Sequence, residues 1–171
     1  MTGWTAAGPF HILAIDPGPT MSAWVVYDPA EKRIVWHAKQ DNEQFLHEEL
    51  GVFADNCHSL AIEMIASYGM AVGADVFETC VWIGRYHQRW LDNGTVAPVQ
   101  RVFRRDVKMH LCGSARAKDA NIRAALIDRF GPGKEKAIGT KKAPGPLYGV
   151  KADVWAALAV AITFAERRPV G

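Results

Sequence analysis

The fold of this chain is set by its first apolar stretch, which reads Ile12-Leu13-Ala14-Ile15-Asp16-Pro17-Gly18-Pro19. A continuous apolar run that ends at an acid is typical of a strand buried on both faces of a sheet. Two prolines and a glycine cannot extend a strand ladder, so the strand predicted over residues 10–15 stops at Asp16. The sequence therefore predicts a buried strand whose carboxyl end presents Asp16.

Three more strands are indicated by short apolar or alternating segments. They span residues 22–27, 33–38 and 59–63. The first three strands are spaced as in an antiparallel meander, whereas helical periodicity over residues 42–57 connects the third strand to the fourth. A strand, helix and strand in this order form a crossover, so we expect the fourth strand to run parallel to the first.

The rest of the chain is predicted to be mainly helical. Helices are expected over residues 74–91, 102–111, 119–130 and 153–167, with a short edge strand at residues 97–99. Residues 131–149 contain five glycines and three prolines, and they are expected to form a loop. The sequence thus predicts one α/β domain over residues 1–171, with a mixed five-stranded sheet flanked by helices.

Length and composition exclude several protein classes. The chain has 171 residues, of which 49% are hydrophobic and 22% charged, as in a globular single domain. It has no apolar run of the roughly 18 residues that a membrane span needs, and its first residues do not resemble a secretory signal. Its three cysteines, Cys57, Cys80 and Cys112, are too few and too widely spaced for a disulfide framework or a zinc site. We therefore expect a cytoplasmic protein with free thiols.

Charge is distributed unevenly along the chain, although the net charge is only +2. Residues 1–100 contain 5 Lys and Arg against 12 Asp and Glu, whereas residues 101–151 contain 13 against 4. Such asymmetry occurs in enzymes of nucleic acids. Folding could equally mix the two signs into an ordinary surface, so this pattern alone does not decide the function.

Three carboxylates are predicted to meet at one edge of the sheet. Asp16 and Glu63 end the two parallel strands, and Asp153 begins the last helix. Neighbouring carboxylates repel unless a cation lies between them, and Mg²⁺ and Mn²⁺ prefer oxygen ligands. Two such ions can activate water and stabilise the leaving oxygen when a phosphodiester is cleaved. Two of these acids also have a structural explanation, since Asp16 could simply start a turn and Asp153 could cap a helix. A charge at Glu63 lies close to the core and costs energy unless it is paired.

In their order along the chain, the motifs resemble those of the RuvC-type Holliday-junction resolvases, a group of ribonuclease H-like nucleases, and especially their small phage-encoded relatives. The matching segments are Ile15-Asp16-Pro17-Gly18, Leu60-Ala61-Ile62-Glu63, Val107-Lys108 with Gly113-Ser114-Ala115-Arg116-Ala117-Lys118, and Ala152-Asp153 with the apolar helix after it. They occur in the family's order and cover almost the whole chain.

This resemblance implies a ribonuclease H-like fold and a metal-dependent endonuclease, in which water cleaves branched DNA, such as four-way junctions in recombination and repair. It implies Mg²⁺ or Mn²⁺ held by Asp16, Glu63 and Asp153, with Lys118 stabilising charge on the phosphate. It also implies a homodimer, because a symmetric junction needs two matched cuts.

The resemblance further suggests which residues contact DNA. The expected phosphate contacts are Arg101, Arg104, Arg105, Lys108 and Arg116. Tyr68 follows the fourth strand and could unstack bases at a branch point. Lys118, Arg104 and Arg105 could instead be solvated, and Tyr68 could pack against protein or a second subunit.

One position departs from the family. Its last motif commonly has two aspartates three residues apart, but here Asp153 is followed by Ala156. A second metal is therefore in doubt, and Asp75 and Glu78 are candidates to supply the missing acid.

Other functions remain open at the level of sequence. A nuclease of the same fold could act on forks, flaps or RNA hybrids, since substrate choice resides in loops. A junction-binding accessory protein without catalysis is also compatible. An ATPase of the actin-like fold is disfavoured, because it would need a second domain and another glycine-rich phosphate loop.

Overall fold

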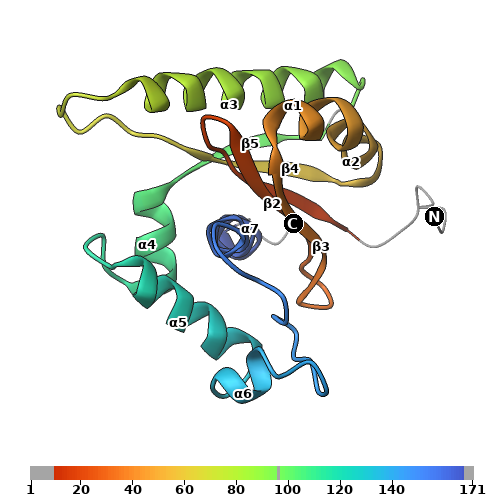
Figure 1. Ribbon diagram of the computed structural model, residues 1–171, viewed down its shortest axis with the longest axis vertical. Helices are drawn as coiled ribbons and strands as arrows, with labels where there is room; N and C mark the ends of the chain where they lie inside the picture. The colour runs from red at the N-terminus through yellow and green to blue at the C-terminus, as the bar shows by residue number, and fades with distance from the viewer. Residues whose placement is uncertain (1–9, 96, 168–171) are drawn as a thin grey trace.

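The computed structural model describes residues 10–95 and 97–167. Its five strands form one mixed sheet in the order β3-β2-β1-β4-β5 (Figure 1). The strands are β1 (Ile12–Asp16), β2 (Met21–Asp28), β3 (Arg33–Asp41), β4 (Ser59–Met64) and β5 (Val99–Phe103). Strands β1 to β3 form the antiparallel meander, while β4 and β5 join it in parallel. The predicted mixed five-stranded sheet is confirmed.

The pairing of β1 with β4 is the feature that builds the site. These parallel neighbours pair Ile12 with Ser59 and continue in register to Ile15 with Ile62. The next residue of each strand is an acid, so Asp16 and Glu63 leave the sheet at the same edge. The crossover expected from the sequence therefore has the predicted geometry.

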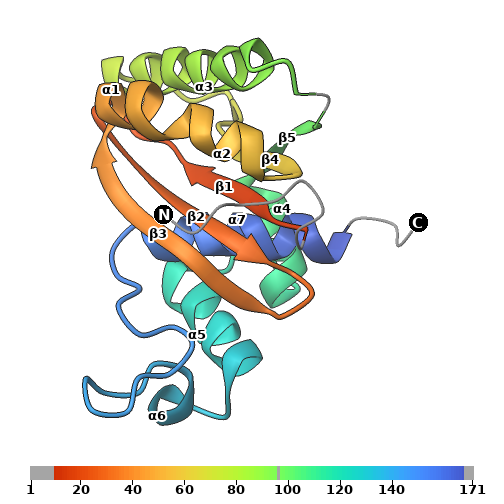
Figure 2. The ribbon, with the colours of Figure 1, turned by 90° about the vertical axis from the view of Figure 1, so that its right-hand side faces the viewer.

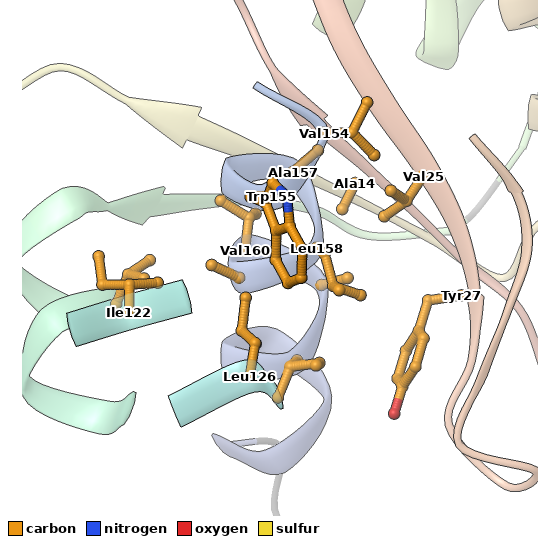
Figure 3. Packing of buried hydrophobic residues seen from close by; sticks show 14 of the residues in the cluster. Ala14, Val25, Tyr27, Ile122, Leu126, Val154, Trp155, Ala157, Leu158 and Val160 are labelled. Carbon is orange, nitrogen blue, oxygen red and sulfur yellow. The ribbon is translucent and has the colours of Figure 1, made fainter. Parts of the chain in front are cut away.

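Helices cover one face of the sheet around α7 (Val154–Arg167). This helix lies across the sheet, and α4 (Arg104–Cys112) and α5 (Asp119–Phe130) pack beside it (Figure 2). Ala14 of β1, Leu126 of α5 and Leu158 and Val160 of α7 are buried in one cluster (Figure 3). The predicted last helix is thus a core element, which explains why it is apolar on most sides.

The other face is covered by α1 (Asn42–Gln44), η1 (Phe45–Glu49), α2 (Leu50–Asn56) and α3 (Ala74–Asp92) (Figures 1 and 2). Leu13 and Ile15 point to this side, whereas Ile12 and Ala14 point to the α7 side. Both faces of β1 are fully buried, as its continuous apolar sequence predicts. The helix predicted over residues 42–57 is interrupted by the π-helical turn η1.

Several boundaries differ from the predictions. The edge strand β5 spans Val99–Phe103 rather than residues 97–99, because Val102 pairs with Glu63 and buries its side chain. Helix α4 consequently begins at Arg104, not at residue 102. The expected loop 131–149 contains the short helix α6 (Lys134–Ala137). No helix among the described residues is long and apolar enough to cross a membrane.

Candidate active site

Asp16 and Glu63 form the centre of the site. Their carboxyl groups lie close enough to interact electrostatically at this edge of the sheet. Burial raises the pKa of Asp16 to about 8, and the negative charges of Glu63 and Asp153 add to this rise. Burial also raises the pKa of Glu63, against the opposing effect of the Arg104 guanidinium. This pair is therefore poised to exchange its proton for another cation.

The turn after Asp16 is fixed by a buried polar network. The Gly18 amide donates to Ser22 Oγ (3.3 Å), and Asn42 Nδ2 donates to the Gly18 carbonyl oxygen (2.9 Å). Ser22 in turn donates to Asn42 Oδ1 (2.7 Å), and its hydroxyl lies 3.0 Å from that of Tyr86. A side chain at Gly18 would approach a main-chain oxygen to 2.4 Å, so only glycine fits. The network holds the backbone beside Asp16 in place, and no local sequence pattern predicts it, because Ser22, Asn42 and Tyr86 come from separate elements.

Asp153 reaches the same place from the opposite side. It lies in the turn before α7, where its carbonyl oxygen accepts from the amides of Ala156 (2.9 Å) and Ala157 (3.1 Å). Ala152 beside it has a left-handed backbone, with φ at 48°. The Asp153 carboxylate is ion-paired with Lys39 of β3. The three predicted acids thus line one cavity, but the Asp153 carboxylate is turned toward a lysine.

Two cavities of about 210 and 230 Å³ adjoin the acids and share Asp16, Glu63 and Arg104 in their walls. The first cavity also has Asp119, Arg123, Asp153 and Ala156 in its wall. The second extends along the segment after β4 to Tyr68, whose side chain is largely exposed. The site therefore opens on both sides of the central carboxylates.

Arg104 lies within the site rather than on a solvated helix face, and its contact with phosphate stays a prediction. Its guanidinium lies 3.5 Å from Glu63 Oε2 and 2.5 Å from Asp119 Oδ1. Asp119 was not singled out from the sequence. Its position directly after Lys118, at the start of a predicted helix in a basic segment, was the available signal.

The other predicted residues surround the site at various distances. Lys118 is exposed at the start of α5, next to Asp119, but it lines neither cavity. Lys108 on α4 is close enough for its charge to lower the pKa of Glu63. Arg101 on β5, Arg105 on α4 and Arg116 before α5 are exposed.

The acids suggested to replace the one missing at Ala156 do not reach the site. Asp75 and Glu78 are exposed on the first turns of α3 and line neither cavity. The additional acid in the wall of the first cavity is Asp119.

The donor set suits a hard divalent cation. All its ligand atoms are carboxylate oxygens, and Glu63 Oε2 is buried without a hydrogen bond. Within residues 10–95 and 97–167, however, no three His, Cys, Asp or Glu side chains are grouped closely enough to hold a metal ion. Asp153 faces Lys39 and Glu63 faces Arg104 instead. The carboxylates are therefore suitable ligands for a divalent metal ion, but in this structure two of them are paired with basic side chains instead.

The fold is that of RuvC. The chain superposes on the structure of Thermus thermophilus RuvC with a TM-score of 0.67 at 19% sequence identity, over 91% of this chain and 93% of that one. It matches T. thermophilus RuvC in complex with a Holliday junction substrate equally well, at 18% identity and with the same coverage. No protein-family model matches the sequence, and no curated protein sequence matches it significantly.

Proposed function

We propose that this chain is a metal-dependent endonuclease that cleaves branched DNA, with a four-way junction as its substrate. One observation carries the proposal: Asp16 and Glu63 lie side by side at one edge of adjacent parallel strands with their carboxyl groups largely buried, and Asp153 lines the same cavity. Such an arrangement destabilises the fold unless it binds a cation. The shared fold with a RuvC that has been solved on a Holliday junction supports the substrate class.

Asp16, Glu63 and Asp153 would hold Mg²⁺ or Mn²⁺. When bound, the ion would activate the attacking water and neutralise charge on the leaving oxygen. Lys118 then stabilises the negative charge that develops on the phosphate, from the start of α5. Water attacks directly, so no covalent bond to the protein forms.

The basic residues around the site would hold the DNA backbone. Lys108, Arg105 and Arg116 lie on α4 and on the segment that leads to α5, and Arg101 lies on the neighbouring β5. Their contribution is expected to weaken with salt. Tyr68, exposed at the rim of the second cavity, is in position to stack on an opened base at the branch point.

A homodimer completes the proposal, and α3 supplies its interface. Phe77 and Val81 are more than half exposed on this helix, and Leu91 is exposed three turns later. Gly84 between them has open space where a side chain would be. Residues 77, 81, 84, 88 and 91 follow the spacing of a helix–helix seam. A second copy of the chain packed on this seam would relate two active sites by a twofold axis, as two symmetric cuts require.

We place this activity in the bacterial cytoplasm, in recombination and repair of host or phage DNA. The three cysteines are unpaired in the structure, as a reducing compartment requires.

The decisive experiment compares a synthetic four-way junction, a fork and a linear duplex, each with Mg²⁺, Mn²⁺ or EDTA. We expect paired symmetric nicks in the junction alone, lost in EDTA and in Asp16→Asn and Glu63→Gln. Asp128→Asn removes an exposed acid of α5 and should cut normally. Equal cutting of all three substrates would refute junction specificity, and binding without cutting would identify an accessory protein.

Lys118→Ala tests the role of the side chain at the start of α5. We expect the cleavage rate at saturating protein to fall about 10²-fold, with a much smaller change in junction affinity. A loss confined to affinity would assign Lys118 to backbone binding instead.

The dimer is tested by sedimentation of wild-type protein and of Phe77→Glu. The charge should convert dimers to monomers without unfolding the chain, because the Phe77 side chain is already 63% exposed. A wild-type monomer at micromolar concentration would contradict this part of the proposal.

A further inference from the structure

Two basic side chains from separate elements reach the carboxylates of the site. Lys39 extends from β3 and ion-pairs with Asp153. Arg104, the first residue of α4, lies 3.5 Å from Glu63 and 2.5 Å from Asp119. Every acid around the first cavity other than Asp16 is therefore in contact with a cation of the chain itself.

The contacts of Arg104 differ from an ordinary surface ion pair in their location. Arg104 lines both cavities, and only 30% of its side chain is exposed. Its positive charge opposes the rise in pKa of both Asp16 and Glu63, so its guanidinium interacts electrostatically with both central acids. Asp119 binds the second nitrogen of the same guanidinium and anchors Arg104 there.

The orientation of the Asp153 and Glu63 side chains follows from their ion pairs with Lys39 and Arg104. Asp153 is turned toward β3 and Glu63 toward α4. This explains why, in the part of the chain that the structure describes, acids that share one cavity do not converge on a single point.

We propose that Lys39 and Arg104 are resident counter-cations, which neutralise the site in the absence of metal and compete with a divalent cation for Asp153 and Glu63. The inference rests on the proposed metal-dependent function. Its consequence is that the chain lowers its own metal affinity: each tethered cation occupies carboxylate oxygens that the metal needs, and each repels the metal. Arg104 and Lys39 are thus positioning residues for the acids.

The experiment measures Mn²⁺ binding by calorimetry on the full chain without DNA. Arg104→Met and Lys39→Met remove one charge each and keep the aliphatic stem. We expect each variant to bind Mn²⁺ about tenfold tighter than wild type, and Arg104→Lys to stay within about twofold of wild type. Arg85→Met is the matched control. Arg85 lies on α3, away from the site, and is ion-paired with Glu43 (2.7 Å), so its removal should leave the Mn²⁺ affinity unchanged.

Thermal unfolding gives a second readout that does not depend on calorimetry. Without metal, Arg104→Met and Lys39→Met should melt at a lower temperature than wild type, since acids are left without a counter-charge. Mn²⁺ should raise the melting temperature of these two variants more than that of wild type, because they bind the ion more tightly, whereas Arg85→Met should gain only as much as wild type.

Unchanged or weaker Mn²⁺ binding in both methionine variants would overturn the inference, since it would show that the two cations do not compete with the metal. In that case wild type would still bind metal and cut DNA, so the proposed function would survive. A wild-type chain that binds no divalent metal would overturn both.

Discussion

Asp16 and Asp28 end neighbouring antiparallel strands, and therefore lie at opposite ends of the sheet. Asp28 is completely buried, but it accepts hydrogen bonds from the amides of Ala30 (3.0 Å) and Glu31 (3.1 Å), with Arg33 at 3.8 Å. The Asp16 carboxyl group instead interacts with the carboxyl groups of Glu63 and Asp153. A buried carboxylate that accepts hydrogen bonds, like Asp28, stabilises the turn around it. A buried carboxyl group beside other carboxyl groups, like Asp16, destabilises the fold, and its presence is explained by a cation that it binds.

The largest effect is expected for Asp16→Asn. The substitution removes a proposed metal ligand, so junction cleavage should fall by roughly 10³-fold or more. It also removes a buried acid, so the metal-free protein should become more stable than wild type. The two measurements are a gel cleavage assay and urea unfolding in EDTA. Loss of both activity and stability would mean that Asp16, like Asp28, is a structural acid.

The second largest effect is expected for Asp28→Ala. It abolishes the two amide contacts of the turn and leaves Arg33 and the buried His11 without their carboxylate, so unfolding should require about 3 kcal/mol less. The measurement is urea unfolding, with Asp128→Ala as an exposed control expected within about 0.5 kcal/mol of wild type. If Asp28→Ala lowered the free energy of unfolding no more than Asp128→Ala does, Asp28 would not be a structural acid and the contrast with Asp16 would fail.

The pH dependence of stability should distinguish the two acids further. In the metal-free protein the folded pKa of Asp16, about 8, lies above its unfolded value, so the folded state keeps a proton that the unfolded state has released. Stability should therefore fall progressively as pH rises from 4 to 8. Asp16→Asn should remove most of this slope, as measured by urea midpoints in EDTA. A slope that persists in Asp16→Asn would assign it to other groups.

The smallest effects concern one strained residue at each end of the sheet. Ala152 precedes Asp153 with φ at 48°, and Lys32 lies in the turn after Asp28 with φ at 49°. Replacing either by glycine should raise the free energy of unfolding by about 0.5 kcal/mol, because glycine adopts this conformation without strain. Only Ala152→Gly should also change Mn²⁺ affinity, since only Ala152 lines a site cavity. Calorimetry of both variants tests this difference.

The sheet was predictable from sequence because its strongest signals are local. The apolar run before Asp16 and the shorter run before Glu63 each identify a buried strand, and the helix between them requires a parallel crossover. These two features predict the edge of the sheet at which Asp16 and Glu63 lie side by side. The position of Asp153 at the head of the last helix follows from its apolar periodicity.

What sequence could not provide are contacts between elements far apart along the chain. Arg104 is predicted to contact phosphate or to lie on a solvated helix face, but in the structure it begins α4 and its guanidinium lies 3.5 Å from Glu63. The pairing of Lys39 with Asp153 joins residues 114 positions apart, and neither residue has a local feature that predicts it. The polar network under Gly18 has the same origin, since Ser22, Asn42 and Tyr86 meet only in the packed core.

The pairing of β1 with β4 also has a kinetic consequence. The first contacts across this pair, such as that of His11 with His58, span 47 residues of chain. Bringing such distant segments together is slow, so Asp16 and Glu63 approach each other only after β1 to β3 have formed their local meander. The repulsion between the acids then acts mainly on the finished structure, and relieving it should slow unfolding more than it speeds folding. The order of assembly thus lets this chain carry a charged centre without hindering its own folding.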